Sequence, residues 1–144
     1  MSTIALNAKN SIGYRFRGFD LSNLNAIVSI AQKGIKPKVF YDFSEAIKMP
    51  IKNLASVLNL SARTISNYDQ QEKLLDPIYS EHLLKLISLY EKGEQLFGNI
   101  DEFNYWLKKP LWNKKSIPFD LIATSGGVDL VTEKLNQLAE GYPL

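Results

Sequence analysis

Few side chains in this sequence could do chemistry on their own, and they do not assemble into a catalytic set. His82 is the only histidine, and it follows Glu81, which is a common solvated pairing. No second ligand stands at metal-binding spacing, so a structural role is favoured over metal binding. Ser125-Gly126-Gly127 lacks the longer glycine pattern and the lysine of a phosphate-binding loop. Asp101 and Glu102 fit the first turn of a helix, where carboxylates interact favourably with the helix dipole. We therefore expect a protein that is not an enzyme, with no catalytic residues, no metal and no cofactor.

Residues 51–69 have the pattern of a helix-turn-helix, which could bind DNA. The apolar residues Leu54, Ala55 and Leu58 would form the inner face of the first helix, and residues 59–61 the turn. The outward side chains would be Ser61, Arg63, Thr64 and Asn67. Their hydrogen-bonding groups suit base edges and phosphates. Plain helical bundles share this geometry, so a purely structural use of the segment remains an alternative.

The elements that would position these residues all read as helices. Apolar residues recur at helical spacing from Leu24 to Ala31, with Asp20 or Ser22 as the cap and Gly34 as the end. Proline or serine marks the start of each following helix. Proline has no backbone N–H, and that group would have no partner in the first turn, whereas a serine hydroxyl accepts a hydrogen bond from an N–H of that turn. These starts are Pro37, Pro50, Ser61 and Asp76-Pro77, with the last helix of this series running to about Leu96.

Three further helices are predicted in the last third of the chain. Asn99 or Asp101 would cap the first, and Pro118 would start a short one ending near Ala123. Ser125 would cap the last, from 126 to 139, with Gly141 just after its end. Residues 14–19 alternate basic and aromatic side chains and predict a short strand or an arm. We expect an all-α fold: a helix-turn-helix bundle followed by a small helical module.

Composition limits the class of protein further. The chain has 144 residues, 45% hydrophobic and 22% charged, and no cysteine, which suits a globular protein of a reducing cytoplasm. The formal net charge is +2, too small to argue for nucleic acid by itself. The basic excess lies in residues 1–50 and the acidic excess in residues 91–144. We expect no secretory signal and no membrane partner, because no stretch reaches the roughly 18 apolar residues that span a bilayer.

The order of residues in the last third of the chain is its most specific feature. Trp106-Leu107 is followed by Pro110, then by Pro118 to Thr124, Gly126-Gly127 and a helix ending near Gly141. This order resembles the toxin-binding module of Xre/MbcA/ParS-type antitoxins, and the resemblance runs from about Ser61 to Gly141. Relatives often carry several arginines directly after the position of Ile65, where this chain has residues 66–69, Ser-Asn-Tyr-Asp. The upstream basic residues Arg15, Arg17, Lys36 and Lys38 are candidates to replace their phosphate contacts.

The resemblance implies an antitoxin of a type II toxin–antitoxin system that neutralises a RES-type, NAD-consuming toxin by covering its active site. It also implies a homodimer within a hetero-oligomeric complex, and binding of operator DNA. The candidate toxin-binding residues are Trp112, on a loop flanked by proline and lysine, and the tail Tyr142, Pro143 and Leu144, which offers a ring, a proline and a carboxylate. The alternative is a helix-turn-helix regulator whose C-terminal module serves dimerisation. The expected organisation is an arm at 1–19, a helix-turn-helix domain at 20–88 and a toxin-binding domain at 89–144.

Overall fold

The predicted all-α class is confirmed. The computed structural model describes residues 8–111 and 115–141, and every regular element in these ranges is a helix. In chain order they are η1 (Ala8–Asn10), α2 (Ile12–Arg15), α3 (Leu24–Lys33), α4 (Pro37–Ala46), α5 (Ile51–Val57), α6 (Ala62–Gln70), α7 (Pro77–Phe97), α8 (Ile100–Leu107), α9 (Pro118–Leu121) and α10 (Ser125–Ala139). No helix in the described ranges is both long and apolar enough to cross a membrane.

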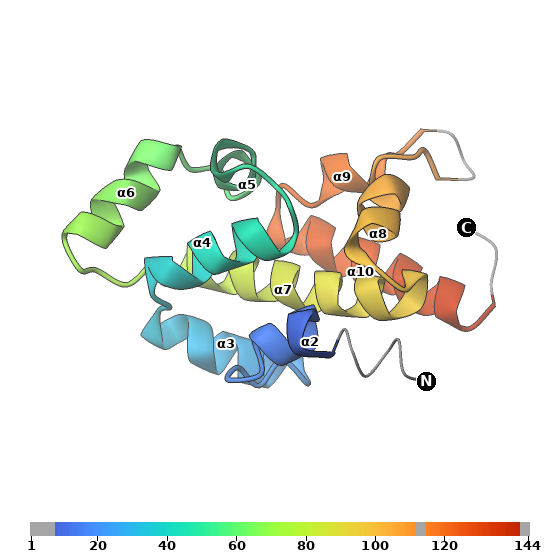
Figure 1. Cartoon of the computed structure of the whole chain (residues 1–144), viewed down its shortest axis with the longest axis horizontal. Coiled ribbons are helices and arrows are strands. Elements are labelled where there is room, and N and C mark those ends of the chain that lie inside the picture. Colours follow the sequence, from blue (N-terminus) through green and yellow to red (C-terminus); the bar gives the residue numbers. More distant parts are fainter. Residues whose placement is uncertain (1–7, 112–114, 142–144) are drawn as a thin grey trace.

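Helix α7 is the central element, and the other helices pack around it. It begins with Pro77 after Asp76, as predicted, and ends at Gly98, whose φ of 92° is a left-handed conformation that glycine adopts freely. Residues 82–90 are all buried, which requires neighbours on every side. Figure 1 shows α3 and α2 along one side of α7 and α4 along another, with α8 and α10 toward one end. Helix α7 is continuous across the expected domain boundary between residues 88 and 89.

Two predicted helix caps are wrong, and in both cases another side chain does the capping. Asn23, not Asp20 or Ser22, caps α3, since its side chain accepts a hydrogen bond from the backbone N–H of Ala26 at 2.9 Å. Thr124 caps α10 through the N–H of the third helical residue. Ser125 is the first residue of α10, and its hydroxyl is bonded to side chains of α7 instead.

The predicted strand or arm over residues 14–19 is partly a helix that packs against the core. Ile12 and Phe16 are buried, and the ring of Phe16 meets that of Phe43 edge-on at 5.9 Å. The backbone N–H of Ile12 donates to the carboxylate of Glu94 on α7 at 2.8 Å. Burial of these two side chains against α7 gives this segment its conformation, which local alternation does not reveal.

The second helix of the helix-turn-helix and the end of the last helix lie at opposite ends of the molecule, whereas α5 lies beside α9 (Figure 1). Helix α6 packs on α4 and α5 and lies at one end of the long axis, whereas α8, α9 and the end of α10 lie toward the other (Figure 1).

Candidate functional site

The predicted DNA-contacting residues lie at the start and along the outer side of α6. The hydroxyl of Ser61 accepts a hydrogen bond from the N–H of Thr64 at 3.0 Å and is 2.9 Å from the Thr64 hydroxyl. These two hydroxyls therefore serve the helix cap. Arg63 and Asn67 are exposed, and their side chains make no hydrogen bond or ion pair within the described residues. They are one turn apart on α6, so a guanidinium and an amide face the same direction.

The charge around α6 is balanced rather than basic. Lys36 and Lys38, at the start of α4, line one depression together with Asp69, Glu72 and Lys73. Lysine supports DNA affinity by neutralising phosphates, and neighbouring carboxylates offset that effect. The two lysines predicted to help α6 thus lie beside its C-terminal end, within a mixed-charge surface.

The two predicted arginines of the N-terminal region are engaged elsewhere. Arg15 pairs with Glu45 at 3.1 Å, and the guanidinium of Arg17 stacks on the ring of Tyr14 at 3.9 Å. Arg15 ends α2 and Arg17 follows two residues later, and α2 packs on α7 rather than on α6. These arginines are poorly placed to extend the surface of α6.

A buried lysine in the middle of α7 attaches the start of α10 to that helix. The side chain of Lys85 is 9% exposed and donates to the Ser125 hydroxyl and to the Asp129 carboxylate, both at 2.8 Å. Glu81 lies 3.5 Å from the same ammonium and accepts a hydrogen bond from Ser125 at 3.0 Å. We call these four residues the Lys85 cluster. The Ser125 hydroxyl thus accepts from Lys85 and donates to Glu81, so the cluster orients α10 on α7.

Two side chains fix the link between α9 and α10, one from α7 and one from the turn of the helix-turn-helix. His82 is buried, with its Nε2 2.7 Å from the carbonyl oxygen of Ile122, so it is a satisfied structural histidine and not a solvated partner of Glu81. Its burial lowers the pKa of the imidazole below the usual 6.5. Asn59, in the turn of the helix-turn-helix, donates its amide to the carbonyl of Ala123 at 2.8 Å.

A glycine permits the close approach of α9 to α10. A Cβ atom on Gly127 would collide with the carbonyl oxygen of Leu121 and lie 2.7 Å from the carbonyl carbon of that residue. The N–H of Gly127 is the donor that Thr124 caps, at 2.9 Å. This contact places the last helix directly against the short one.

The aromatic side chains of α8 form an internal stack. Phe103 is buried, and its ring lies 5.9 Å from those of Phe97 and Trp106. A Cβ on Gly93 would collide with the Phe103 ring, which explains a glycine inside α7. Trp106 is partly buried and packs against the core.

Two other aromatic side chains of this module each lie beside a lysine, Tyr105 in solvent and Phe119 partly buried against the core. Tyr105 is 62% exposed, with the ammonium of Lys109 4.1 Å from its ring centroid. The ammonium of Lys108 lies 5.5 Å from the ring centroid of Phe119. Sequence reasoning did not identify Tyr105, although its position between the inward residues Phe103 and Trp106 indicates an outward side chain.

The loop after α8 is closed by a backbone hydrogen bond from the N–H of Leu111 to the carbonyl of Ser116, at 2.8 Å. Gly141 follows the last helix with a φ of 89°, a left-handed conformation that turns the chain after α10. The structure does not describe the predicted toxin-binding residues, which are Trp112, Tyr142, Pro143 and Leu144.

No group of three or more His, Cys, Asp or Glu side chains within residues 8–111 and 115–141 is arranged to hold a metal ion. In these ranges, buried polar contacts connect the helices, and exposed aromatic and basic side chains lie on their surface.

Comparison with known proteins identifies the C-terminal region. Residues 92–141 match the family described as the antitoxin Xre/MbcA/ParS C-terminal toxin-binding domain. The match covers roughly a third of the chain and includes the end of α7 and all of α8, α9 and α10. No curated protein matches the chain. The last two helices that Gly127 and the Lys85 cluster position, α9 and α10, thus lie in the region that is similar to the toxin-binding domain of Xre/MbcA/ParS antitoxins.

Proposed function

We propose that this protein is a cytoplasmic antitoxin of a type II toxin–antitoxin system that neutralises a RES-type, NAD-consuming toxin by covering its active site. The observation that carries the proposal is the family match over residues 92–141. A protein that inhibits by contact needs a well-ordered binding surface, because ordering it on binding would cost affinity. The Lys85 cluster and the contact at Gly127 supply such order for α10.

We assign the toxin contacts to Trp112 and to residues 142–144, together with the outer face of α8. Tyr105 and Lys109 support this assignment, since exposed aromatic side chains are common anchors of protein interfaces. They precede the loop that contains Trp112 by only a few residues.

The test is an assay of NAD consumption by the purified toxin, alone and with the antitoxin, after copurification of the two proteins. The proposal expects a stable complex and suppressed NAD loss. If no stable complex forms with a RES-type protein from the neighbouring gene, the proposal fails.

Deleting residues 142–144 tests the part of the mechanism that involves the tail. If the tail enters the NAD cleft, the truncated complex should persist while much of the NAD consumption returns, because α8 and α10 still hold the toxin. Full suppression by the truncated protein would instead assign inhibition to the body of the domain.

A second candidate function is operator binding by α5 and α6 of a homodimeric transcriptional regulator. The observation that favours it is the pair of exposed, unpartnered side chains Arg63 and Asn67 on one side of α6. In this alternative, the C-terminal module would serve dimerisation instead of inhibition. The assay of NAD consumption distinguishes the two functions, because a regulator whose C-terminal module only dimerises would not suppress the toxin.

A further inference from the structure

Residues 121–123, at the end of α9, present three successive backbone carbonyls to three different parts of the molecule. The first lies against Gly127 of α10, with no room for a Cβ atom between them. The second is 2.7 Å from Nε2 of His82 on α7. The third accepts a hydrogen bond at 2.8 Å from the amide of Asn59, in the turn before α6. We call residues 121–123 the α9 junction.

Helix α9 depends on such contacts because it is very short. It has four residues, Pro118–Leu121, and its N-cap residue Ile117 has no side-chain group that could accept a hydrogen bond. An isolated helix of fewer than about 12 residues is at best marginally stable in water. The last carbonyls of a helix also have no partner inside it. Within the matched region α9 packs on α8 and α10, and His82 and Asn59 connect it to the rest of the chain.

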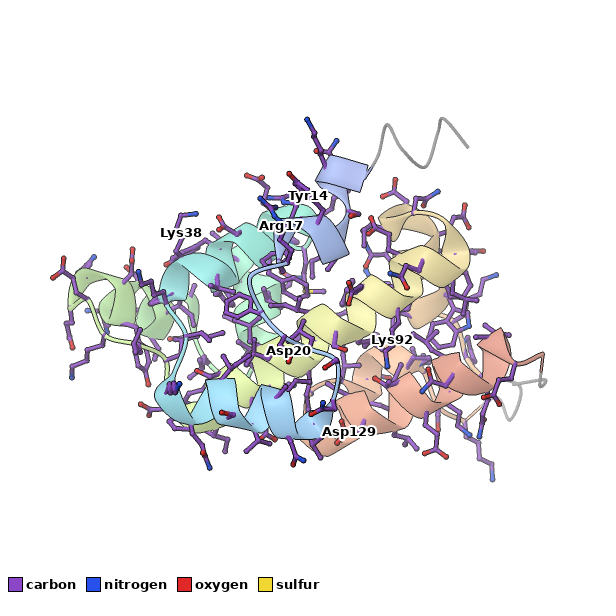
Figure 2. All side chains as sticks on the ribbon, turned by 90° about the horizontal axis from the view of Figure 1, so that it is seen from below. Tyr14, Arg17, Asp20, Lys38, Lys92 and Asp129 are labelled. Carbon is purple, nitrogen blue, oxygen red and sulfur yellow. The ribbon has the colours of Figure 1, made fainter. Side chains whose placement is uncertain are left out.

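Helix α10, in contrast, is held on α7 by contacts of its own. Figure 2 shows α10 lying beside α7, with Asp129 near its start. The Asp129 carboxylate accepts a hydrogen bond from Lys85 at 2.8 Å, and Val131 and Leu135 of α10 are buried. Loss of a contact at the α9 junction would therefore loosen α9 and leave α10 on α7.

The position of α9 matters for the toxin contacts that we propose. Trp112 stands in the chain between α8 and α9. The N–H of Leu111 donates to the carbonyl of Ser116 at 2.8 Å. The ammonium of Lys108, just after α8, lies 5.5 Å from the ring centroid of Phe119 on α9. The geometry of the proposed toxin-binding surface between these two helices thus depends on where α9 lies.

We propose that His82 and Asn59 are positioning residues for toxin binding, because they hold the α9 junction and thereby the orientation of α9 that the toxin recognises. This proposal rests on the proposed function. Both residues lie outside the matched residues 92–141, so the matched region relies on α7 and on the helix-turn-helix for its binding geometry. Toxin affinity then depends on side chains that need not touch the toxin, since a loosened α9 must be ordered on binding.

Asn59→Gly tests the proposal by removing the amide and keeping the conformation of the turn. Asn59 has a φ of 61°, a left-handed conformation that glycine adopts freely. Glu72→Gly is the matched control, because Glu72 has a φ of 54° and is exposed in the turn after α6. In the full-length chain, we expect Asn59→Gly to speed toxin dissociation about threefold, the loss expected of one exposed hydrogen bond. Glu72→Gly should change it by less than about 1.5-fold.

His82→Leu removes the second donor. The hydrogen bond to Ile122 is buried, so its carbonyl would lose its partner away from water, and we expect dissociation to be about tenfold faster. The double variant with Asn59→Gly should lose less than the product of the two effects, because both changes release the same short helix. Urea unfolding identifies conditions in which each variant is fully folded, where a merely structural role would leave toxin affinity unchanged.

Amide exchange of the free protein tests the α9 junction without the toxin. The N–H of Asp120 bonds to the carbonyl of Ile117 at 2.9 Å inside α9. We expect Asn59→Gly to speed its exchange about threefold or more and to leave α3 unchanged, since the opening is local. This measurement and the Asn59 variant decide the matter even if His82→Leu does not fold.

The results separate this proposal from the proposed function. If the unchanged protein binds no RES-type toxin, both fail. If it binds and the folded variants keep its affinity, or if Asn59→Gly and Glu72→Gly behave alike, this proposal alone is wrong. Unaltered amide exchange in α9, or exactly multiplicative effects of the two substitutions, would also overturn it.

Discussion

Replacing Gly127 by alanine should displace the last helix, whereas the same change at the adjacent Gly126 should not. A Cβ on Gly127 would collide with the carbonyl oxygen of Leu121, which is backbone and cannot rotate away. A Cβ on Gly126 would have no atom within 4 Å. Both glycines lie in the first turn of α10, so the pair isolates the steric effect from helix propensity.

The size of the effect follows from this contact. Overpacking a well-filled site costs about 1–3 kcal/mol, and a backbone neighbour places Gly127→Ala near the upper limit, at about 3 kcal/mol. For a chain of this length, that corresponds to a fall of about 10 °C in Tm. Gly126→Ala should raise the free energy of unfolding by about 0.5 kcal/mol, since alanine loses less backbone entropy in a helix than glycine does.

Urea unfolding of the two variants measures the difference, and toxin affinity reports whether the shift of α10 reaches the binding surface. We expect Gly127→Ala to bind the toxin more weakly even where it is fully folded. If the two alanine variants have the same free energy of unfolding within about 0.5 kcal/mol, the close approach of α9 to α10 does not position this domain.

Three other outcomes can be checked. The hydroxyl of Tyr90 is buried without a hydrogen-bond partner among the described residues, so Tyr90→Phe should leave the free energy of unfolding unchanged or raise it by about 1 kcal/mol in urea titrations; a loss of that size would reveal a partner. Because burial lowers the pKa of His82, the unfolded chain binds a proton first as the pH falls below 6.5. Stability should therefore decrease below that pH, and His82→Gln should flatten this dependence in unfolding experiments across the range. Arg63→Ala and Asn67→Ala should each weaken operator binding by about 1–3 kcal/mol in fluorescence anisotropy if they read bases, with toxin affinity unchanged; equal operator affinity would exclude α6 as the reader.

Local sequence features predicted those helices whose ends depend on one residue. Pro37, Ser61 and Pro77 start helices as expected, because a fixed φ or a capping hydroxyl acts within a single turn. Gly34 ends α3 with a φ of 84° for a similarly local reason. The order of motifs in the last third of the chain predicted the similarity that residues 92–141 show to the toxin-binding domain, because the ordered set is more specific than any single motif.

Contacts between distant residues could not be predicted in the same way. Ser125 had the right type and place for a cap, but Lys85 and Glu81 bind its hydroxyl across 40 residues or more of sequence, and Thr124 takes over the capping. The spacing of Glu81 and Lys85 predicts one face of α7, although not that α10 covers it. Gly127 shows no local sign of its role, because the atom it makes room for belongs to another helix.

The positions of α6 and of the toxin-binding domain bear on how the two proposed activities would combine. They lie at opposite ends of the long axis, so a toxin bound around α8 and α10 would leave Arg63 and Asn67 accessible to DNA. The two ends are nevertheless joined, because the Asn59 amide in the turn before α6 holds the carbonyl of Ala123 just before α10. A toxin that shifts α10 would pull on that turn and change the orientation of α6. Direct competition between toxin and operator is thus sterically unfavoured. An influence of one on the other would pass through this contact, through α7, or through the hydrogen bond from the Asn104 amide on α8 to the carbonyl of Ile47 after α4.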